Sequence, residues 1–478
     1  MDSDLRTTAS FSAGAATGDD PRRFPAGFVW GAGTSAYQIE GGVDLDGRGP
    51  SIWDTFAATG RTRGDSGAVA ADHRRLMAAD VALMADLGLA AYRFSVAWPR
   101  VMPDGVGAVS RSGLDFYREL VDELLDAGIE PVATLYHWDL PQALEDAGGW
   151  PARATAERFA DYAAVVAGAL GDRVRRWTTV NEPWCAAMLG YASGVHAPGR
   201  TDPGAAAAAA HHLLLAHGLG VDVLRATVTA PDPDIGITVN PYPVLPADPE
   251  PSAADLDAVR RIDGIANRVW YDPVLLGSYP EDVVDDLARV SDLAHVRDGD
   301  LDQIARPIDH LGLNYYRCYH VRHAPGASAS PSPWPGSPDV AFVEPAASPT
   351  SNGWAVEPEG LYDCLVRLAT DYEPPPLLVH ENGGAFPDDV GADGRVHDAD
   401  RRAFLDAHIR SAHDAIAAHV DLRGYFVWSL LDNFEWAEGY NQRFGIVHVD
   451  FATQRRTPKA SALWYRDVIA AHGLDGRP

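Results

Sequence analysis

The chain has 478 residues, of which 46% are hydrophobic and 22% charged, so it can bury a large core and is not intrinsically disordered. Its 67 acidic residues outnumber its 39 basic ones, and the resulting net charge of −28 disfavours nucleic acid and anionic membrane surfaces as partners. The only lysine is Lys459, and every other fixed side-chain cation is an arginine.

The three cysteines, at positions 185, 318 and 364, are far apart and form no C-x-x-C pair. This sparse, odd number is typical of a protein from a reducing compartment. The first thirty residues contain no apolar run of signal-peptide length, and no stretch looks like the roughly 20 apolar residues of a membrane helix. We therefore expect a cytoplasmic protein that does not enter a membrane.

Amphipathic helical patterns alternate along the chain with short apolar runs. Leu76 and Leu83 recur at helical spacing before Gly88, and a similar pattern ends at Gly128, a residue type that commonly terminates helices. The apolar runs are continuous rather than alternating, which is typical of strands buried on both faces. Eight strands are predicted, at residues 28–31, 91–96, 131–136, 177–181, 235–240, 310–316, 377–381 and 425–430.

Eight strands with room for a helix in each gap predict an α/β protein, a single (β/α)8 TIM barrel with inserted loops at the C-terminal face. Periodicity alone leaves a doubly wound sheet open as the competing fold. We place the barrel at residues 24–470, after a flexible N-terminal segment (1–23) and before a C-terminal tail (471–478). Residues 323–353, rich in Pro, Ser and Ala, are predicted to form a loop over a functional face, and the alanine run at 204–212 a helix.

Polar and aromatic residues follow several predicted strands, which is where barrel enzymes build their active sites. The segments are YHWD at 136–139, TTVNEP at 178–183, NYY at 314–316, HENGG at 380–384 and SLLDNFEW at 429–436. Two of these ends carry a carboxylate, Glu182 and Glu381. A pair of carboxylates suits glycosidic bond cleavage, in which one group protonates the leaving oxygen and the other attacks the anomeric carbon. Nearby aromatic rings suit the C–H faces of a sugar.

The sequence resembles the glycoside hydrolase family 1 β-glucosidases from residue 24 to about 469. The similarity is carried by FVWGAGTSAYQIEG at 28–41, HWDLPQAL at 137–144, TTVNEP, GYASGVHAPG at 190–199, GLNYY at 312–316, GWAVEPEGL at 353–361, HENGGAF at 380–386 and VWSLLDNFEWAEGYNQRFGIVHVD at 427–450. The resemblance implies a retaining enzyme that hydrolyses terminal non-reducing β-D-glucosyl residues through a covalent glycosyl-enzyme. Its substrates would be small β-glucosides or cello-oligosaccharides from cellulose degradation, with β-galactosides and β-fucosides as further candidates and no metal or cofactor.

The resemblance also implies roles for individual residues. Glu381 would be the nucleophile and Glu182 the acid/base, with a carboxylate separation of about 5–5.5 Å. The residues supporting the nucleophile would be Arg93, Asn314 and Tyr316. The substrate-binding residues would be Gln38, His137, Trp138, Asn181, Trp354, Trp428, Glu435, Trp436 and Phe444. The family's phospho-sugar hydrolases have Ser, Lys and Tyr where this chain has Glu435, Gln442 and Phe444, so a phosphorylated substrate is not expected.

His380 is a departure from the family pattern, which usually has Thr before the nucleophile. It either adds a titrating group beside Glu381, which would affect the pH optimum, or points into the barrel wall. The histidines at 211, 212 and 217 lack a carboxylate or cysteine that would complete a metal site, and a solvated or capping role is expected.

Two other functions compete with the glycosidase. Gly31-Ala-Gly-Thr-Ser-Ala36 fits a dinucleotide-binding pattern, with Asp54 about 20 residues further on, and would indicate an NAD-dependent oxidoreductase. The segment after it carries no helical apolar stripe, which argues against that reading. A non-catalytic sugar-binding barrel is the third hypothesis, although both carboxylates are present. The sequence leaves open whether the chain is a monomer or a homo-oligomer.

Overall fold

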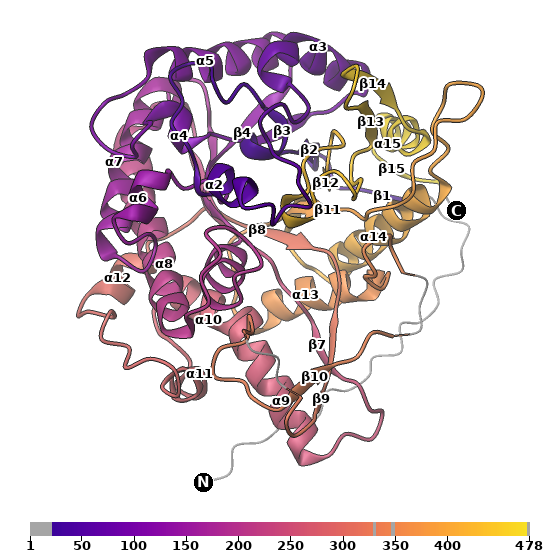
Figure 1. Cartoon of the computed structure of the whole chain (residues 1–478). Helices are drawn as coiled ribbons and strands as arrows, with labels where there is room; N and C mark the ends of the chain where they lie inside the picture. The colour runs from indigo at the N-terminus through magenta and orange to yellow at the C-terminus, as the bar shows by residue number, and fades with distance from the viewer. Residues whose placement is uncertain (1–21, 328–330, 346–348, 476–478) are drawn as a thin grey trace.

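The computed structural model describes residues 22–327, 331–345 and 349–475. Eight parallel strands close into a barrel, with the last strand paired to the first (Figure 1). These strands are β2 (Val29–Gly33), β3 (Ala91–Ser95), β4 (Glu130–Tyr136), β5 (Arg176–Asn181), β6 (Asp234–Val239), β8 (His310–Tyr315), β11 (Leu377–Asn382) and β12 (Leu422–Trp428). The predicted TIM barrel and its eight strands are confirmed, with small differences at the strand ends.

Helices surround the barrel and bury their apolar sides against it (Figure 1). The longer ones are α3 (His73–Asp86), α5 (Arg111–Asp126), α7 (Arg153–Leu170), α8 (Pro203–Thr227), α9 (Ala253–Asp263), α13 (Pro358–Asp371), α14 (Ala399–Ala417) and α15 (Ala460–Ala471). Shorter helices are α1 (Ala36–Ile39), α2 (Ile52–Ala58), α4 (Trp98–Val101), α6 (Gln142–Asp146), η1 (Cys185–Ala192), η2 (Gly264–Arg268), α10 (Val269–Leu275), α11 (Glu281–Leu287), α12 (Asp300–Ile304) and η3 (Trp436–Glu438).

Helix α5 illustrates how the sequence produces this outer ring. Phe116, Leu120 and Leu124 recur at helical spacing and are all buried. The side chain of Ser110 caps the N-terminus by accepting a hydrogen bond from a backbone amide in the first turn. Gly128 ends the helix with φ +75°, a left-handed conformation that glycine adopts without steric strain.

The predicted loop at 323–353 contains regular structure. Strand β9 (Tyr319–His323) pairs with β10 (Val340–Phe342) and with β7 (Val244–Pro246) in a small sheet beside the barrel. Residues 328–330 and 346–348 lie outside the described part of the chain. Other small sheets join β13 (Val447–Asp450) to β14 (Arg455–Pro458) and β1 (Arg22–Arg23) to β15 (Gly473–Leu474).

The last of these sheets ties the two predicted terminal segments to each other. Residues 22–23 and 473–474 belong to those segments and pair with each other at one side of the barrel (Figure 1). The rest of the predicted flexible segment, residues 1–21, and the tail residues 476–478 lie outside the described residues.

Helix α8 corrects two expectations drawn from the sequence. The predicted alanine-rich helix is present, but α8 is long and apolar enough to cross a membrane, and 78% of its most apolar stretch is buried inside the protein. Its histidines are buried instead of solvated: His211 bonds Asp300, His212 bonds a backbone carbonyl, and His217 bonds Thr179. Within the described residues, no group of three or more His, Cys, Asp or Glu could hold a metal ion.

The dinucleotide-binding alternative is wrong. The Gly31–Ala36 pattern lies on barrel strand β2 and leads into α1, which has four residues, so no long helix presents its N-terminus to a pyrophosphate. The carboxylate of Asp54 caps α2 by accepting a hydrogen bond from the amide of Ser51 at 2.6 Å. Both parts of the fingerprint therefore have structural roles in the barrel.

The ring of His380 lies inside the barrel, which supports the second of the two readings. A hydrogen bond of 2.7 Å joins its Nδ1 to Thr238 Oγ1, and the ring packs edge-on against Phe426. Gly312 makes room for the ring, because a Cβ there would lie 2.3 Å from His380 Nδ1. Burial and then the positive charge of Arg93 lower the pKa of His380 well below its usual value, so the imidazole stays neutral.

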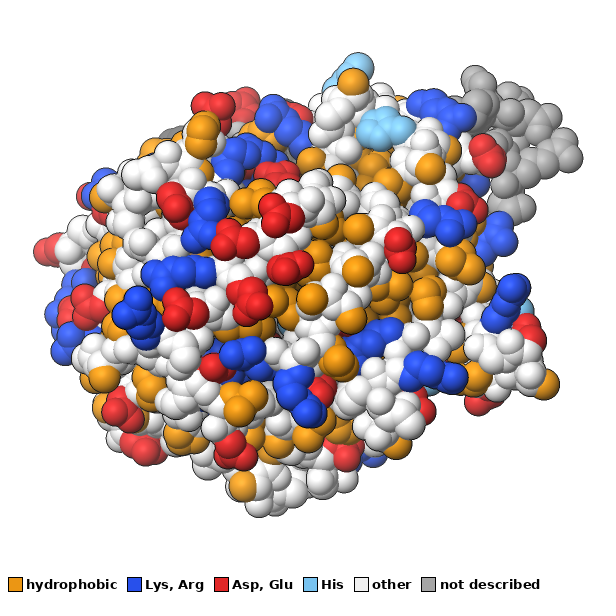
Figure 2. All heavy atoms as spheres, turned by 90° about the horizontal axis from the view of Figure 1, so that it is seen from above, with side chains coloured by type: hydrophobic (Ala, Val, Ile, Leu, Met, Phe, Trp, Pro, Cys, Tyr) orange, Lys and Arg blue, Asp and Glu red, His pale blue; other side chains and the backbone are white. Residues whose placement is uncertain are grey.

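The charged surface matches the composition. On the face of the barrel that carries α3 and α5, acidic and basic side chains are interspersed, without a large basic patch (Figure 2). The single lysine does not contribute to the surface, because the Lys459 side chain is fully buried. Its ammonium donates to Asp388 and, at 2.7 Å, to Asp432. Asp432 in turn accepts the backbone amides of Gly445 and Val449, so this ion cluster holds the segment after β12 in place.

We expect Lys459→Met to destabilise the protein by about 1.5–3 kcal/mol, because two buried carboxylates lose their shared cation while Asp388 keeps Arg401 and Asp432 keeps Arg443. Urea unfolding followed by far-ultraviolet circular dichroism measures the change. The matched control is Arg466→Met on α15, which breaks the exposed pair with Asp467 and should cost less than about 1 kcal/mol. Equal losses in the two variants would contradict a special role for the buried cluster.

Candidate active site

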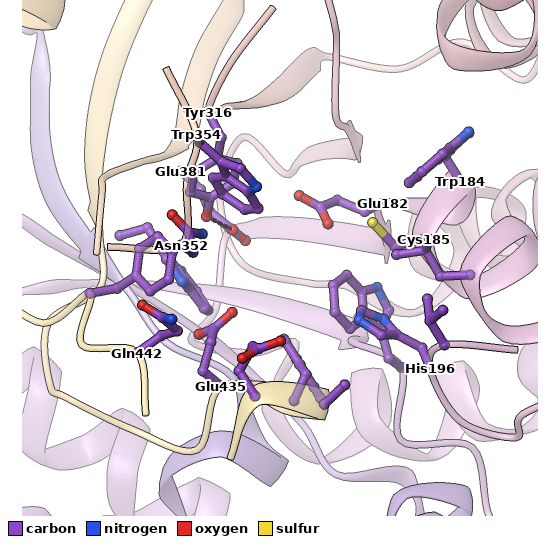
Figure 3. Close-up of a pocket in the computed structure, with 18 of the residues that line it drawn as sticks. Glu182, Trp184, Cys185, His196, Tyr316, Asn352, Trp354, Glu381, Glu435 and Gln442 are labelled. Carbon is purple, nitrogen blue, oxygen red and sulfur yellow. Dashed lines mark hydrogen bonds between the residues drawn. The ribbon is translucent and has the colours of Figure 1, made fainter. Parts of the chain in front are cut away.

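A cavity of about 570 Å³ opens at the C-terminal ends of the barrel strands (Figure 3). Ten of the fourteen predicted site residues line it, drawn together from five strand ends and from Trp354, just after the 323–353 loop. They are Glu182, Glu381, His137, Trp138, Tyr316, Trp354, Trp428, Glu435, Trp436 and Phe444. The prediction that the polar strand ends converge on one site is therefore confirmed.

The two carboxyl groups come from strand ends on different sides of the cavity. Glu381 is part of β11, and Glu182 follows the last residue of β5. Both are almost fully buried, with exposures of 3% and 5%. Glu182 has a left-handed backbone conformation (φ 46°), as do Trp138 (φ 75°) and Trp436 (φ 51°). Such conformations are costly for residues other than glycine and are concentrated at functional sites.

Glu381 is held by groups that favour its charged form. Arg93, on β3, donates from Nη1 to Glu381 Oε1 at 2.6 Å, and the pair is fully enclosed. The hydroxyl of Tyr316 donates to Glu381 Oε2 at 2.7 Å. Of the three residues predicted to support the nucleophile, Arg93 and Tyr316 therefore contact it, one at each oxygen of the carboxylate.

Glu182 has a different set of partners. Asn314 Nδ2 donates to Glu182 Oε1 at 2.7 Å and to Asn181 Oδ1 at 3.1 Å. Asn314 was predicted to support the nucleophile, but its hydrogen bonds go to the second carboxyl and to Asn181. Unlike Glu381, Glu182 has no direct ion pair with Arg93.

These surroundings divide the proton between the two carboxyls. Burial raises the pKa of Glu182, and the negative charge of Glu381 raises it further. Burial also raises the pKa of Glu381, but the charge of Arg93 and the hydrogen bond from Tyr316 oppose that rise. The pair therefore keeps its proton on Glu182 and its charge on Glu381, as an acid and a nucleophile require.

Two predicted substrate-binding residues lie behind the cavity wall. Asn181 accepts a 2.5 Å hydrogen bond from Arg93 Nη2, and its own amide meets His137. Gln38 donates to Glu435 at 3.3 Å and to the Phe434 carbonyl at 2.9 Å. Neither lines the empty cavity. As placed here, both side chains position groups that do line it.

Aromatic rings form two walls of the cavity. Trp428, Phe444, Tyr316 and Trp354 make one cluster, with Trp428 and Phe444 buried. On the other side the ring centres of Trp138 and Trp436 lie 4.5 Å apart. These flat apolar surfaces suit the C–H faces of a sugar ring.

His137 lies between the aromatic walls, stacked at 5.8 Å from the ring of Trp428 and at 5.9 Å from that of Trp436. Its Nδ1 is buried and has no hydrogen-bond partner within residues 22–327, 331–345 and 349–475. A buried unpaired ring nitrogen is costly.

Glu435 is the third acidic group in the cavity. Burial, followed by the charges of Glu381 and Glu182, raises the pKa of Glu435 to about 8, so it is largely protonated near neutral pH. The case against a phosphorylated substrate therefore rests less on Glu435 than on the loss of the lysine at position 442. The cavity lining does include Arg63, which is paired with Glu438. Gln442 faces the cavity where the phospho-sugar enzymes have lysine, and Lys459 is engaged in buried ion pairs.

Several lining residues were not predicted. Trp184 and Cys185 lie two and three residues after the acidic residue that follows β5, and Tyr242 lies three residues after the end of β6. Their positions just after barrel strands were a signal that the sequence analysis did not use. Asn352 comes from the 323–353 loop, whose predicted place over the functional face is confirmed. Trp334 of that loop packs on Trp184 with ring centres 5.0 Å apart.

A barrel whose C-terminal face holds two unlike carboxyls between aromatic walls is the arrangement of a glycoside hydrolase. Comparison with known proteins agrees. The model of glycosyl hydrolase family 1 matches residues 20–474, and the chain belongs to this family.

Curated and solved relatives are similar over nearly their whole length. The thermostable beta-glucosidase B of Thermobispora bispora is 51% identical, over 94% of this chain and 91% of that protein. The bifunctional beta-D-glucosidase/beta-D-fucosidase of Bifidobacterium breve is 48% identical, over 94% and 98%. The family 1 β-glucosidase structure from Thermotoga maritima superposes with a TM-score of 0.90 at 44% identity, over 95% and 100%. The same enzyme in complex with galacto-hydroximolactam gives 0.88 at 45% identity, with the same coverage.

Proposed function

We propose that this glycoside hydrolase is a retaining β-glucosidase that releases terminal non-reducing β-D-glucosyl residues from small β-glucosides or cello-oligosaccharides. The observation that carries the proposal is the unequal surroundings of the two carboxyls. Arg93 and Tyr316 stabilise a charged Glu381, while Glu182 keeps a proton beside it. The names of the relatives support glucose as the sugar.

In the first step the Glu381 carboxylate forms a bond to the anomeric carbon. The bond from that carbon to the aglycone oxygen breaks, and Glu182 gives its proton to that oxygen. The negative charge thereby leaves Glu381 and appears on Glu182. In the second step the Glu182 carboxylate takes a proton from water, the water oxygen bonds to the anomeric carbon, and Glu381 is released.

β-Fucosides and β-galactosides are the second candidate substrates. The relative from Bifidobacterium breve is named for both glucosidase and fucosidase activity, and the Thermotoga maritima enzyme has been solved with a galacto-configured inhibitor. In this chain Gln38 and Glu435 form the hydrogen-bonded group expected to sense the sugar's 4-hydroxyl. Because a protonated Glu435 can donate as well as accept, both epimers can be hydrogen-bonded.

Proton NMR of the reaction with an aryl β-glucoside tests the proposal. We expect β-glucose to be released first, followed by slow mutarotation to the α-anomer. Initial α-glucose would exclude double displacement, and no glucose at all would favour the non-catalytic sugar-binding barrel. Parallel assays on aryl β-galactoside and β-fucoside measure the breadth of specificity.

A further inference from the structure

A second cavity, of about 320 Å³, adjoins the active-site cavity. Its mostly apolar walls come from the 323–353 loop, the end of η1, the start of α8 and the segment after α11. Trp334 lines this second cavity, and Trp184 lines the active-site cavity. Their ring centres lie 5.0 Å apart, so the two cavities meet at this pair of rings.

A tight turn holds the backbone of Trp334 in place. The segment WPGS, which begins at Trp334, has proline second and glycine third, as is typical of a type II turn. The Ser337 amide donates to the Trp334 carbonyl at 3.2 Å, and Gly336 has φ +76°. A Cβ on Gly336 would lie 2.3 Å from the Asp286 carbonyl oxygen of α11, and the Gly336 carbonyl accepts from Arg289 at 3.2 Å. The turn is therefore fixed against α11.

The ring of Trp334 is also held in place by its neighbours. Phe342 of β10 stacks on it with ring centres 5.1 Å apart, and Tyr319 of β9 packs edge-on at 5.3 Å. Trp334 is nevertheless only half-buried, whereas Trp184 is 3% exposed. A ring that is already ordered can offer its free surface to a ligand at little further cost in side-chain entropy.

The leaving-group side of the substrate lies toward these rings. In the proposed reaction Glu182 protonates the glycosidic oxygen, so the aglycone begins at Glu182 and extends away from Glu381. Figure 3 shows Glu182 between Glu381 and Trp184. An oligosaccharide whose terminal unit is held at Glu381 therefore extends toward Trp184 and then toward Trp334.

We propose that Trp334 and the second cavity form a distal subsite for the third or fourth glucosyl unit of a cello-oligosaccharide. The inference rests on the proposed β-glucosidase function and specifies chains longer than cellobiose as its preferred substrates. The flat indole ring suits the C–H face of a glucosyl unit. The guanidinium of Arg289 and the hydroxyls of Thr201 and Ser332, which line the same cavity, suit the hydroxyls of that unit.

The test measures kcat/KM for cellobiose, cellotriose and cellotetraose. In the wild-type enzyme we expect a rise of about three- to tenfold from cellobiose to cellotetraose. The rise should come from a lower KM, because contacts remote from the reaction bind substrate and transition state alike. Trp334→Leu keeps an apolar side chain without a flat ring, and should lose the rise while its cellobiose kinetics stay unchanged. Trp334→Phe, which keeps a smaller ring, should retain part of the rise.

The matched control is Trp464→Leu, which removes a half-buried tryptophan on α15 that lines neither cavity. It should show the wild-type dependence on chain length. Calorimetric binding of cellobiose and cellotetraose to Glu182→Gln, with and without Trp334→Leu, measures the same contact without turnover. Cellotetraose should bind more tightly than cellobiose only where Trp334 is present.

A wild-type enzyme with no rise along the series, or a Trp334→Leu variant that keeps the full rise, would overturn the proposal. If Trp334→Leu does not fold, a full rise in Trp334→Phe would do the same. A preference for n-octyl β-glucoside over cellotetraose that survives in Trp334→Leu would assign the second cavity to an apolar aglycone instead. Failure of the underlying function is separable, because the wild-type enzyme would then leave cellobiose intact or release α-glucose first.

Discussion

Replacement of Glu381 by glycine is expected to lower β-glucoside hydrolysis by about 10⁴-fold or more, because no other group can form the bond to the anomeric carbon. The vacated space lies between Arg93 Nη1 and the Tyr316 hydroxyl, both of which donate to the present carboxylate. Added azide should bind there as a small anion and attack 2,4-dinitrophenyl β-glucoside. A single displacement gives the α-glucosyl azide, identified by NMR.

The matched control is Glu381→Gln, which removes the charge but fills the same space. We expect it to be as inactive as the glycine variant and to show no rescue by azide. A β-azide product from the glycine variant would mean that the anion attacks from the wrong face, and the same product from both variants would place the nucleophile elsewhere.

The fold could be predicted from the sequence because each barrel strand is buried on both faces and therefore leaves a continuous apolar run. The segment LLVHEN in β11 is an example: after three buried apolar residues and His380 comes the carboxylate of Glu381. The polar ends of the strands then identify one face of the barrel as the site. These signals are local, so a single sequence suffices to find them.

What could not be predicted is which side chains reach the cavity. Gln38 and Asn181 were predicted to bind the sugar, yet the side-chain amides of both are hydrogen-bonded to protein groups. A position near a strand end does not determine whether a side chain faces the cavity or its protein neighbours. Cys185 was known only as one of three scattered thiols. Its place in the cavity lining depends on the π-helical turn of η1, which apolar periodicity does not reveal.

The same limit applies to Lys459. Its uniqueness in the sequence helped to argue against a phospho-sugar site, but nothing in the sequence showed that it is buried between Asp388 and Asp432. Long-range ion pairs of this kind join residues 71 and 27 positions apart. They are fixed by the packing of the whole barrel and not by any local pattern.

Replacement of Glu182 by alanine should separate the two steps of the reaction. The leaving group of cellobiose is a second glucose, which needs the proton of Glu182. The value of kcat/KM on cellobiose should therefore fall by about 10²–10⁴-fold. The 2,4-dinitrophenolate group leaves without protonation, and kcat/KM on its β-glucoside should change little. Its kcat should nevertheless fall, because the glycosyl-enzyme on Glu381 has lost the base that activates water.

With Glu182→Ala, azide should give a product of the opposite configuration from the one expected with Glu381→Gly. It needs no base, so it should release the glycosyl-enzyme of Glu182→Ala and give the β-glucosyl azide, with net retention after two displacements. Glu182→Gln, which keeps an amide beside Asn314 and leaves no room for azide, should show the same dependence on leaving group without the rescue.

Equal losses of kcat/KM on cellobiose and on the dinitrophenyl substrate would remove Glu182 from the acid role. An α-azide would remove the covalent intermediate. Because the two variants predict azides of opposite configuration, one product analysis assigns both carboxyls independently.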